Sequence, residues 1–269
     1  MMRIAIITLI IWLLGVTALW AEEKIVLGGS GGLTDEMSDL AKAYMAKNPS
    51  DKIEVLKETM GTSGGIGAVL NGRVTIGLVT HMPKGDHQSK LVYRVIARSP
   101  VGVAVHKSQP ISSLTEIQIC DIFSGKTHSW KEVGGGDGKI SVLTRRQNDA
   151  NAEAMREKVA CFKDLKFTPE AIALSKGSEV LDGVNRRPGT IGIISATFNA
   201  TDRGDIKTLA ISGTPPTPEM VRSGKYRVYN ERAVVTLGAP HGASKRFLDF
   251  VAGPEGQKIL MQRDMIPVS

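Results

Sequence analysis

Aromatic residues are scarce in this chain of 269 residues, at 5 %, whereas glycine is abundant at 29 residues. This composition argues against an aromatic-rich β-sandwich and favours an α/β protein with many tight turns between strands and helices. After the first 21 residues, no stretch of the sequence is long and apolar enough to span a bilayer. The bulk of the chain is therefore predicted to be a globular α/β protein.

The N-terminal segment has the order of a secretory signal peptide. Residues 1–3 carry a positive charge, an uncharged apolar run extends to Trp20, and Ala21 precedes a charged run at 22–24. Residues 1–21 are therefore predicted to be a signal peptide, and the alternative is an uncleaved N-terminal anchor. No cysteine lies near this segment, which excludes a lipoprotein, so we expect the mature protein in the periplasm.

Cysteine is limited to Cys120 and Cys161. In an exported protein an even number of cysteines suggests one disulfide, and the alternative is two buried free thiols. Without further His or Cys at ligand spacing, the two thiols cannot complete a tetrahedral metal site. We expect no metal and no cofactor.

The net charge is +7, but Lys and Arg are dispersed along the chain. Such an excess favours an anionic ligand and does not form the basic stripe of a nucleic-acid-binding surface. We therefore expect no nucleic-acid partner.

Strands and helices alternate in the predicted mature chain. The first unit has strands at 24–28, 52–56 and 74–79, with a helix at 34–48 and a short helix that ends at Asn71. Strand, turn and helix repeated in this way predict a parallel sheet with helical crossovers.

Two extended regions, 93–106 and 226–237, flank a second α/β unit. In that unit a capping box at 113–116 opens a helix that Gly125 ends. Further strands are predicted at 140–144 and 190–194, and further helices at 150–161, 178–185, 244–251 and 255–262. Two crossings between two units predict a two-lobed, hinged molecule, with residues 22–96 and 232–269 in lobe 1 and residues 97–231 in lobe 2.

Two Gly-rich turns, at 28–32 and 61–65, each follow a predicted strand and open a helix. Backbone N–H groups and the positive end of a helix dipole can hold an anion there without a cationic side chain. The hydroxyls of Ser30, Thr62 and Ser63 add donors. The alternative is that the turns are only tight connections.

Arg145 and Arg146 follow a third predicted strand. They could supply the charge-assisted hydrogen bonds that an oxyanion favours, or they could form a solvated pair.

Both turns also match the nucleophile pattern G-x-S-x-G, at Ser30 and Ser63. A serine hydrolase needs a histidine base, and His241 fits the chain order of that class. However, the pattern occurs twice and no oxyanion-hole motif accompanies it. We therefore expect no catalytic residue and no enzyme activity, and keep a serine hydrolase as the second hypothesis.

Five segments resemble, in the same order, the PstS-type phosphate-binding proteins of ABC importers. They are GTSGGI at 61–66, DIFSGK at 121–126 with Trp130, GTIGI at 189–193, SGKY at 223–226 with Arg232, and FLDFV at 247–251 with PEGQ at 254–257. The resemblance covers nearly the whole mature chain. It implies a two-lobed periplasmic-binding-protein-like fold of type II, of the α/β class, with two crossing strands as the hinge.

The same resemblance implies a monomer that captures inorganic phosphate or a related oxyanion and delivers it to an ABC transporter permease. A sensing or adhesion relative of the same fold is the third hypothesis. The first Gly-rich turn matches the family's first phosphate loop in position, and the second matches the second loop. The ligand set implied for this chain is Ser30, Gly31, Gly32, Thr62, Ser63, Gly64, Thr80, Arg145, Arg146, Asn148 and Asn151.

Two positions depart from the family pattern. Where the family has Asp after the third strand, this chain has Thr80 followed by His81, a change that could relax selectivity among oxyanions. Where the family has Arg followed by Ser-Gly-Thr, this chain reads RRQNDAN at 145–151. The arginine is retained in one of two registers, Asn148 and Asn151 could replace the hydroxyls, and Asp149 would repel an anion if it faced the cleft.

Overall fold

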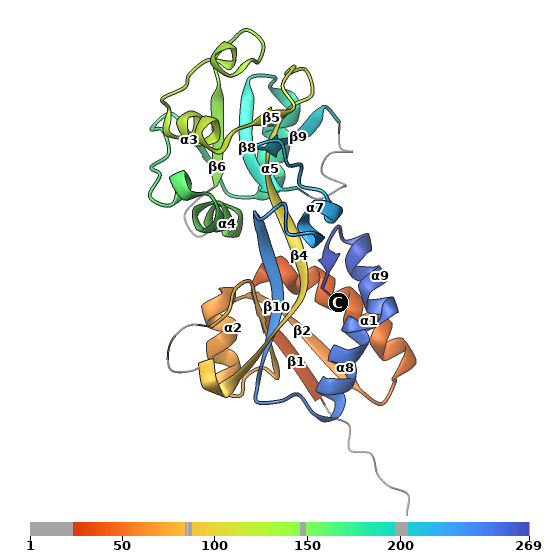
Figure 1. The fold of residues 1–269 in the computed structure, drawn as a ribbon. Helices are drawn as coiled ribbons and strands as arrows, with labels where there is room; N and C mark the ends of the chain where they lie inside the picture. Colours follow the sequence, from red (N-terminus) through yellow and green to blue (C-terminus); the bar gives the residue numbers. More distant parts are fainter. Residues whose placement is uncertain (1–23, 84, 86–87, 146–148, 197–203, 269) are drawn as a thin grey trace, which may run out of the picture.

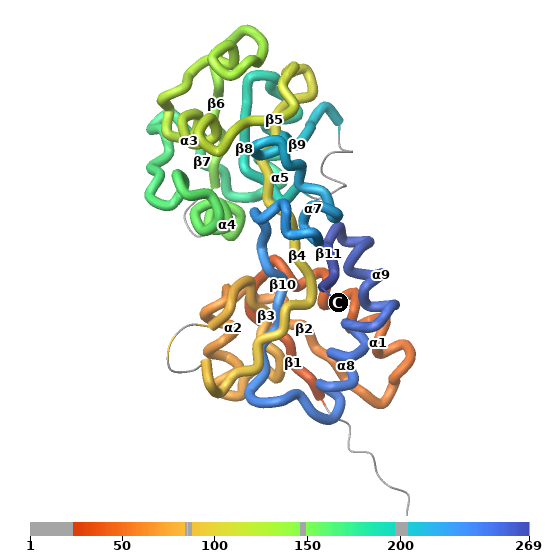
Figure 2. The backbone as a smooth tube through the Cα atoms, in the orientation of Figure 1, coloured from red at the N-terminus to blue at the C-terminus, as the bar shows by residue number. Residues whose placement is uncertain are grey.

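The computed structural model describes residues 24–83, 85, 88–145, 149–196 and 204–268. Two lobes are joined by two long strands, β4 (Leu91–His106) and β10 (Tyr229–Leu237), which run side by side between them (Figures 1 and 2). The lobe that carries both β1 and the last strand, β11, is termed the lower lobe, and the other the upper lobe. This is the two-lobed α/β fold that the sequence predicted.

The sheet of the lower lobe has the strand order β2-β1-β3-β10-β4. β1 (Lys24–Gly29), β2 (Lys52–Thr59) and β3 (Ile76–Val79) are parallel, as the repeated strand–turn–helix pattern predicted. β10 runs antiparallel to both β3 and β4. A short C-terminal strand, β11 (Ile266–Pro267), pairs with β4 beside the crossing point.

Helices cover both faces of this sheet. Successive side chains of a strand point to opposite faces, so Val234 packs in the core under α1 (Thr34–Lys47) and α8 (Gly242–Ala252). Its neighbour Val235 packs under α2 (Gly61–Leu70). The lower lobe is completed by α9 (Pro254–Gln262) and by two 3-10 helices, η1 (Gly31–Leu33) and η2 (Gln88–Lys90).

In the upper lobe the strand order continues from β4 as β8-β6-β7, and β9 pairs with both β4 and β5. The bounds are β5 Ser113–Leu114, β6 Ser141–Arg145, β7 Ile172–Leu174, β8 Thr190–Ser195 and β9 Ile206–Ile211. The helices are α3 Glu116–Ser124, α4 Ala150–Lys158, α5 Gly177–Arg186 and α7 Pro218–Arg222, with 3-10 helices η3 Trp130–Val133 and η4 Ala160–Phe162.

Within the part of the chain that the structure describes, most aromatic side chains gather in the core of the upper lobe. Phe162 packs edge to face against both Phe123 and Phe167, the last two rings are tilted to each other, and the ring centroids are 5.6 to 5.9 Å apart. Beside them, Cys120 of α3 and Cys161 of η4 form a disulfide. The disulfide and the aromatic cluster therefore fasten the same two elements.

The capping box predicted at 113–116 is wrong by two residues. Thr115 accepts from the backbone N–H of Gln118 (3.1 Å), and the Gln118 side chain accepts from the N–H of Thr115 (2.8 Å). Ser113 cannot cap the helix because it lies in β5, where its hydroxyl donates to the carbonyl of Ala210 (3.1 Å). Gly125, with a φ of 79°, ends the helix as predicted.

The second Gly-rich segment, predicted as a turn before a helix, forms the first turn of α2 itself. Gly61 begins that turn with a φ of 69°, a left-handed conformation that favours glycine. Gly65 lies so close to β1 that a Cβ atom on it would sit 2.9 Å from the Cα of Gly29. Glycine is thus required here for the close approach of α2 to the sheet.

Within the residues that the structure describes, no helix is long and apolar enough to cross a membrane. The predicted signal peptide, residues 1–21, lies outside the described ranges.

Candidate functional site

The ends of β1, β2 and β3 lie close together on the lower lobe, and predicted ligand residues follow each of them in the sequence. The N–H of Met60 donates to the carbonyl of Gly29 (2.9 Å), which brings the start of α2 beside the end of β1. Gly31 of η1 lies against Thr59, at the end of β2. The two Gly-rich segments are therefore neighbours in space.

Thr62 and Thr80 join the start of α2 to the end of β3. The backbone N–H of Thr80 donates to the Thr62 hydroxyl (3.1 Å), and the two hydroxyl oxygens are 3.0 Å apart. Ser63, the next residue, has an exposed side chain. The first N–H groups of a helix have no acceptor within it, so this corner offers both hydroxyl and backbone donors.

The first Gly-rich segment offers fewer donors than the sequence predicted. The N–H of Ser30 donates to the carbonyl of Leu78 (2.8 Å) and is used within the fold. Gly31 and Gly32 then form the start of the short helix η1. The hydroxyl of Ser30 makes no capping hydrogen bond to that helix.

Arg232 of β10 reaches the same segment, although it was not among the ligand residues predicted from the sequence. Its Nη1 donates to the carbonyl of Gly32 (3.0 Å), and its Nε is buried without a partner. Burial lowers the pKa of its guanidinium, while the charge of Glu36 in the first turn of α1 opposes that shift. The available signal was its position directly before the apolar run 233–235 of β10, in one of the segments on which the family resemblance rests.

In the upper lobe, Arg145 ends β6 and faces Asp149, the residue that caps α4. Its Nη1 is 2.5 Å from Asp149 Oδ1, and its Nη2 donates to the carbonyl of Ser175 (3.3 Å). Asp149 accepts from the N–H of Ala152 (3.4 Å) through its other oxygen. Arg145 is thus held by partners within its own lobe.

Asn151, in the first turn of α4, is buried and links three elements. Its side-chain oxygen accepts from Asn230 of β10 (2.7 Å) and from Ser195 of β8 (3.3 Å). It therefore ties α4 to the crossing strand. The two other predicted ligand residues of this segment, Arg146 and Asn148, lie outside the described residues.

A cleft of about 590 Å³ lies between the two lobes. Thr80, His81 and Met82 line it from the lower lobe, α4 lines it from the upper lobe beginning at Ala150, and residues 229–231 of β10 line it from the crossing. Of the predicted ligand residues, Thr80 lines this cleft directly. Its partner Thr62 lies immediately behind it.

Charged side chains of both signs line the cleft, and several are paired. Glu231 accepts a hydrogen bond from the hydroxyl of Tyr93, and burial together with that bond raises the pKa of Tyr93. Glu157 forms an ion pair with Lys158 (2.7 Å), which raises the pKa of the ammonium group. The cleft is therefore polar but is not strongly basic.

The geometry gives the serine-hydrolase hypothesis no support. Among the described residues, the one histidine ring that bonds a serine hydroxyl is His106, and its partner is Ser108 (2.7 Å) rather than Ser30 or Ser63. His241, which fitted the chain order, sits at the start of α8. Within the described ranges, no group of three or more His, Cys, Asp or Glu side chains is placed to hold a metal ion.

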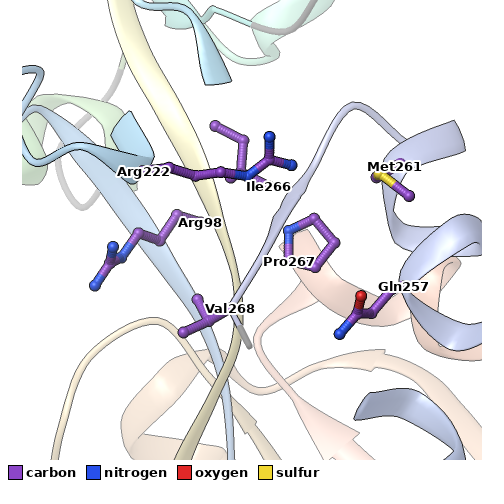
Figure 3. A pocket seen from close by; sticks show the side chains of 7 residues that line it. All are labelled: Arg98, Arg222, Gln257, Met261, Ile266, Pro267 and Val268. Atoms are coloured by element: carbon purple, nitrogen blue, oxygen red, sulfur yellow. The ribbon is translucent and has the colours of Figure 1, made fainter. Parts of the chain in front are cut away.

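A second pocket, of about 310 Å³, lies beside the crossing strands and contains none of the predicted ligand residues. Figure 3 shows that the guanidinium of Arg98 points away from Gln257 and Met261 on the far wall. The Cζ atom of Arg98 lies 4.8 Å from the ring centroid of Tyr229, a residue that lines the interlobe cleft. The walls come from β4, α7, α9 and the C-terminal segment that includes β11, and the lining residues are Arg98, Arg222, Gln257, Met261, Ile266, Pro267 and Val268.

Comparison with known proteins identifies the family of this chain. A family model described as a PBP superfamily domain matches residues 16–255. The phosphate-binding protein PstS of Bacillus subtilis (strain 168) is 27 % identical over 253 residues, which are 93 % of this chain and 82 % of that protein. The phosphate-binding protein PstS of Borreliella burgdorferi is 24 % identical over 257 residues, 92 % of this chain and 91 % of that protein.

Among solved structures, a phosphate ABC transporter substrate-binding protein from Clostridium perfringens with bound phosphate is similar over 92 % of this chain and 100 % of that one. The TM-score is 0.76 and the sequence identity 28 %. The match spans both lobes, in agreement with the fold described above. The chain belongs to the PBP superfamily, and its relatives there are PstS-type phosphate-binding proteins.

Proposed function

We propose that this chain is an extracytoplasmic solute-binding protein that captures inorganic phosphate, or a closely related tetrahedral oxyanion, for an ABC transporter. The observation that carries the proposal is the meeting of η1, the start of α2 and Thr80 at the ends of three parallel strands beside the interlobe cleft. Backbone N–H groups at helix starts bind anions. The phosphate-binding relatives match this chain over both lobes.

The oxyanion is held mainly from the lower lobe in this proposal. Donors are the N–H groups of η1 and of the first turn of α2, with the hydroxyls of Ser30, Thr62, Ser63 and Thr80. The upper lobe, taken as residues 97–231, closes on residues 22–96 and 232–269 and excludes water. Arg145 and Asn151 face the ligand from that side, and Arg146 and Asn148 complete the proposed ligand set.

In this role the chain binds its ligand and catalyses no reaction. Hydrogen-bond donors that surround an oxyanion without a general base hold it and do not activate a nucleophile. Residues 1–21 direct export to the periplasm, where the mature protein acts as a monomer and delivers its ligand to a transporter permease.

Calorimetry on the mature protein after removal of bound ligand tests this proposal. Phosphate, arsenate, sulfate and phosphonates are titrated in parallel, since Thr80 and His81 stand where the resemblance implied an acidic residue. We expect one site that binds phosphate or arsenate. At a ligand concentration a hundred times Kd, binding should raise the free energy of unfolding by ~2.7 kcal/mol and so raise the melting temperature. Binding of a neutral solute, with no response to any oxyanion, would overturn the proposal. Native mass spectrometry of the purified protein identifies the ligand directly.

A further inference from the structure

The carboxylate of Asp149 already occupies the place where the upper lobe could hold an anion. One oxygen is 2.5 Å from Nη1 of Arg145, and the other accepts from the N–H of Ala152 at the start of α4 (3.4 Å). The Asp149 side chain is only 5 % exposed. A guanidinium and the N-terminus of a helix are two groups that attract a negative charge, and here the same carboxylate uses both.

Arg145 is fixed in this arrangement from two sides. While Nη1 contacts Asp149, Nη2 donates to the carbonyl of Ser175 (3.3 Å). Its Nε is buried without a hydrogen-bond partner, so the two contacts hold the guanidinium in place without using all of its donors. The Asp149 carboxylate is itself costly to keep charged, since burial raises its pKa while the charge of Arg145 opposes that shift. A second negative charge beside it would be resisted.

We propose that Asp149 is an internal anion that competes with the ligand for Arg145 and for the start of α4, and so sets the oxyanion affinity of the cleft. The inference rests on the proposed function. The lower lobe then supplies most of the binding of the oxyanion. Arg145 contributes little to affinity as long as Asp149 retains it, although its position at the end of β6 suits an anion ligand.

The variant Asp149→Asn tests the effect of the negative charge of Asp149 alone. Asparagine caps a helix as well as aspartate does, so the start of α4 keeps its cap while the negative charge is removed. We expect phosphate to bind Asp149→Asn about tenfold more tightly or better than it binds the wild type, a gain of ~1.4 kcal/mol. The control is Asp137→Asn, which changes the net charge equally on an exposed residue paired with Lys131. That variant should leave the affinity within about twofold.

A double-mutant cycle tests whether the effect runs through Arg145. Arg145→Gln should weaken phosphate binding about tenfold more in the Asp149→Asn background than in the wild-type background. Thermal unfolding of all four proteins without ligand checks that each is folded. The comparison of Asp149→Asn with the wild type stands by itself if Arg145→Gln alone fails to fold.

The outcomes separate the two proposals. Phosphate binding by the wild type with equal or weaker binding by Asp149→Asn would overturn the role of Asp149 and leave the proposed function in place. A loss of affinity on Arg145→Gln that is the same in both backgrounds would also overturn it. If neither the wild type nor Asp149→Asn binds phosphate, arsenate or sulfate, both proposals fail together.

Discussion

The Thr62 hydroxyl accepts a hydrogen bond from the backbone N–H of Thr80, at 3.1 Å, and so fastens the start of α2 to the end of β3. Ser63, one residue further along, is exposed. The two hydroxyls were equivalent ligand candidates by sequence, yet the structure gives Thr62 an additional role in the fold. Substitutions at the two positions should therefore have different effects.

Thr62→Val should lower the free energy of unfolding by ~1–2 kcal/mol, because the partly buried N–H of Thr80 loses its acceptor. Ser63→Ala should leave stability within ~0.5 kcal/mol. It should nevertheless weaken phosphate binding about tenfold to a hundredfold, since it removes a hydrogen bond to a charged ligand, ~1.5–3 kcal/mol. Urea denaturation and calorimetry measure the two effects separately.

Thr62→Ser is the matched control, because it keeps the hydroxyl and should retain most of the stability. Equal stability losses at positions 62 and 63 would contradict this division of roles. The same Ser63→Ala protein also serves as a check on catalysis. A fluorophosphonate probe should label neither it nor the wild type, and labelling that Ser63→Ala abolishes would identify a nucleophile.

Two glycines of α2 should respond to alanine in opposite directions. A Cβ on Gly65 would lie 2.9 Å from the Cα of Gly29 and 3.0 Å from the carbonyl oxygen of Leu78, both backbone atoms that cannot easily move. Gly65→Ala should therefore destabilise the protein by ~1–3 kcal/mol. Gly67 is exposed with no atom within 4 Å of the corresponding position, so Gly67→Ala should stabilise by ~0.4–1 kcal/mol. Thermal unfolding compares them, and equal stability of the two variants would refute the close approach of α2 to β1.

Acid should weaken the contact between α1, α8 and the loop before β2. Arg246 donates to Asp51 through Nη2 (2.7 Å), Tyr44 donates to the same carboxylate, and these hydrogen bonds hold the pKa of Asp51 below its usual value. A carboxylate with a lowered pKa stabilises the fold above its unfolded pKa, near 4, and that contribution is lost as the pH falls through the lower folded value.

The variant Asp51→Asn should be less stable than the wild type at pH 7 by ~1–3 kcal/mol. The difference should shrink as the pH falls below about 4, where the Asp51 carboxylate of the unfolded chain becomes neutral, and should vanish only below the lower pKa of the folded protein. Urea denaturation of both proteins between pH 7 and pH 3 makes the comparison. A difference that stays constant over this range would mean that the charge of Asp51 does not contribute.

Reduction should act on the upper lobe through Cys120 and Cys161, which close a loop with a sequence separation of 41. A disulfide across a loop of that length contributes ~3–4 kcal/mol by restricting the unfolded chain. Denatured, unreduced protein should show no free thiol on titration. The double variant Cys120→Ala with Cys161→Ala should unfold at a lower urea concentration than the oxidised wild type, and at nearly the same concentration as the reduced one. Two titratable thiols before reduction would contradict the bridge.

The sequence predicted the long elements well because their periodicity is local. The apolar stripe of α1, for example, is visible in the printed order of Met37, Leu40, Ala41 and Tyr44, all of which are buried. The strands β5, β7, β9 and β11 and the helix α7 were not predicted. β5, β7 and β11 have two or three residues each and β9 has six, and the pairing partners of all four strands lie elsewhere in the chain. Tertiary pairing determines such elements more than local pattern does.

The residues of the candidate site likewise include some that local sequence patterns could identify and some that they could not. The Gly-rich segments could be found from sequence because a glycine run before a helix is a local pattern. The contact of Arg232 with Gly32 could not, since 200 residues separate them. Asp149 was recognised from sequence as a charge unfavourable to an anion. Its pairing with Arg145 is close in sequence, at a separation of four residues, but it depends on how the end of β6 and the start of α4 face each other.

The path of the chain through the two lobes has a consequence for folding. β10 lies between β3 and β4 in the lower sheet, although the whole upper lobe separates it from both in sequence. Strands β5 to β9 pair among themselves and with β4, so the upper sheet needs no strand that follows β9 in the sequence. Contacts that are close in sequence form first. We therefore expect the lower sheet, with Thr62 and Thr80 at its edge, to be the last part of the molecule to assemble.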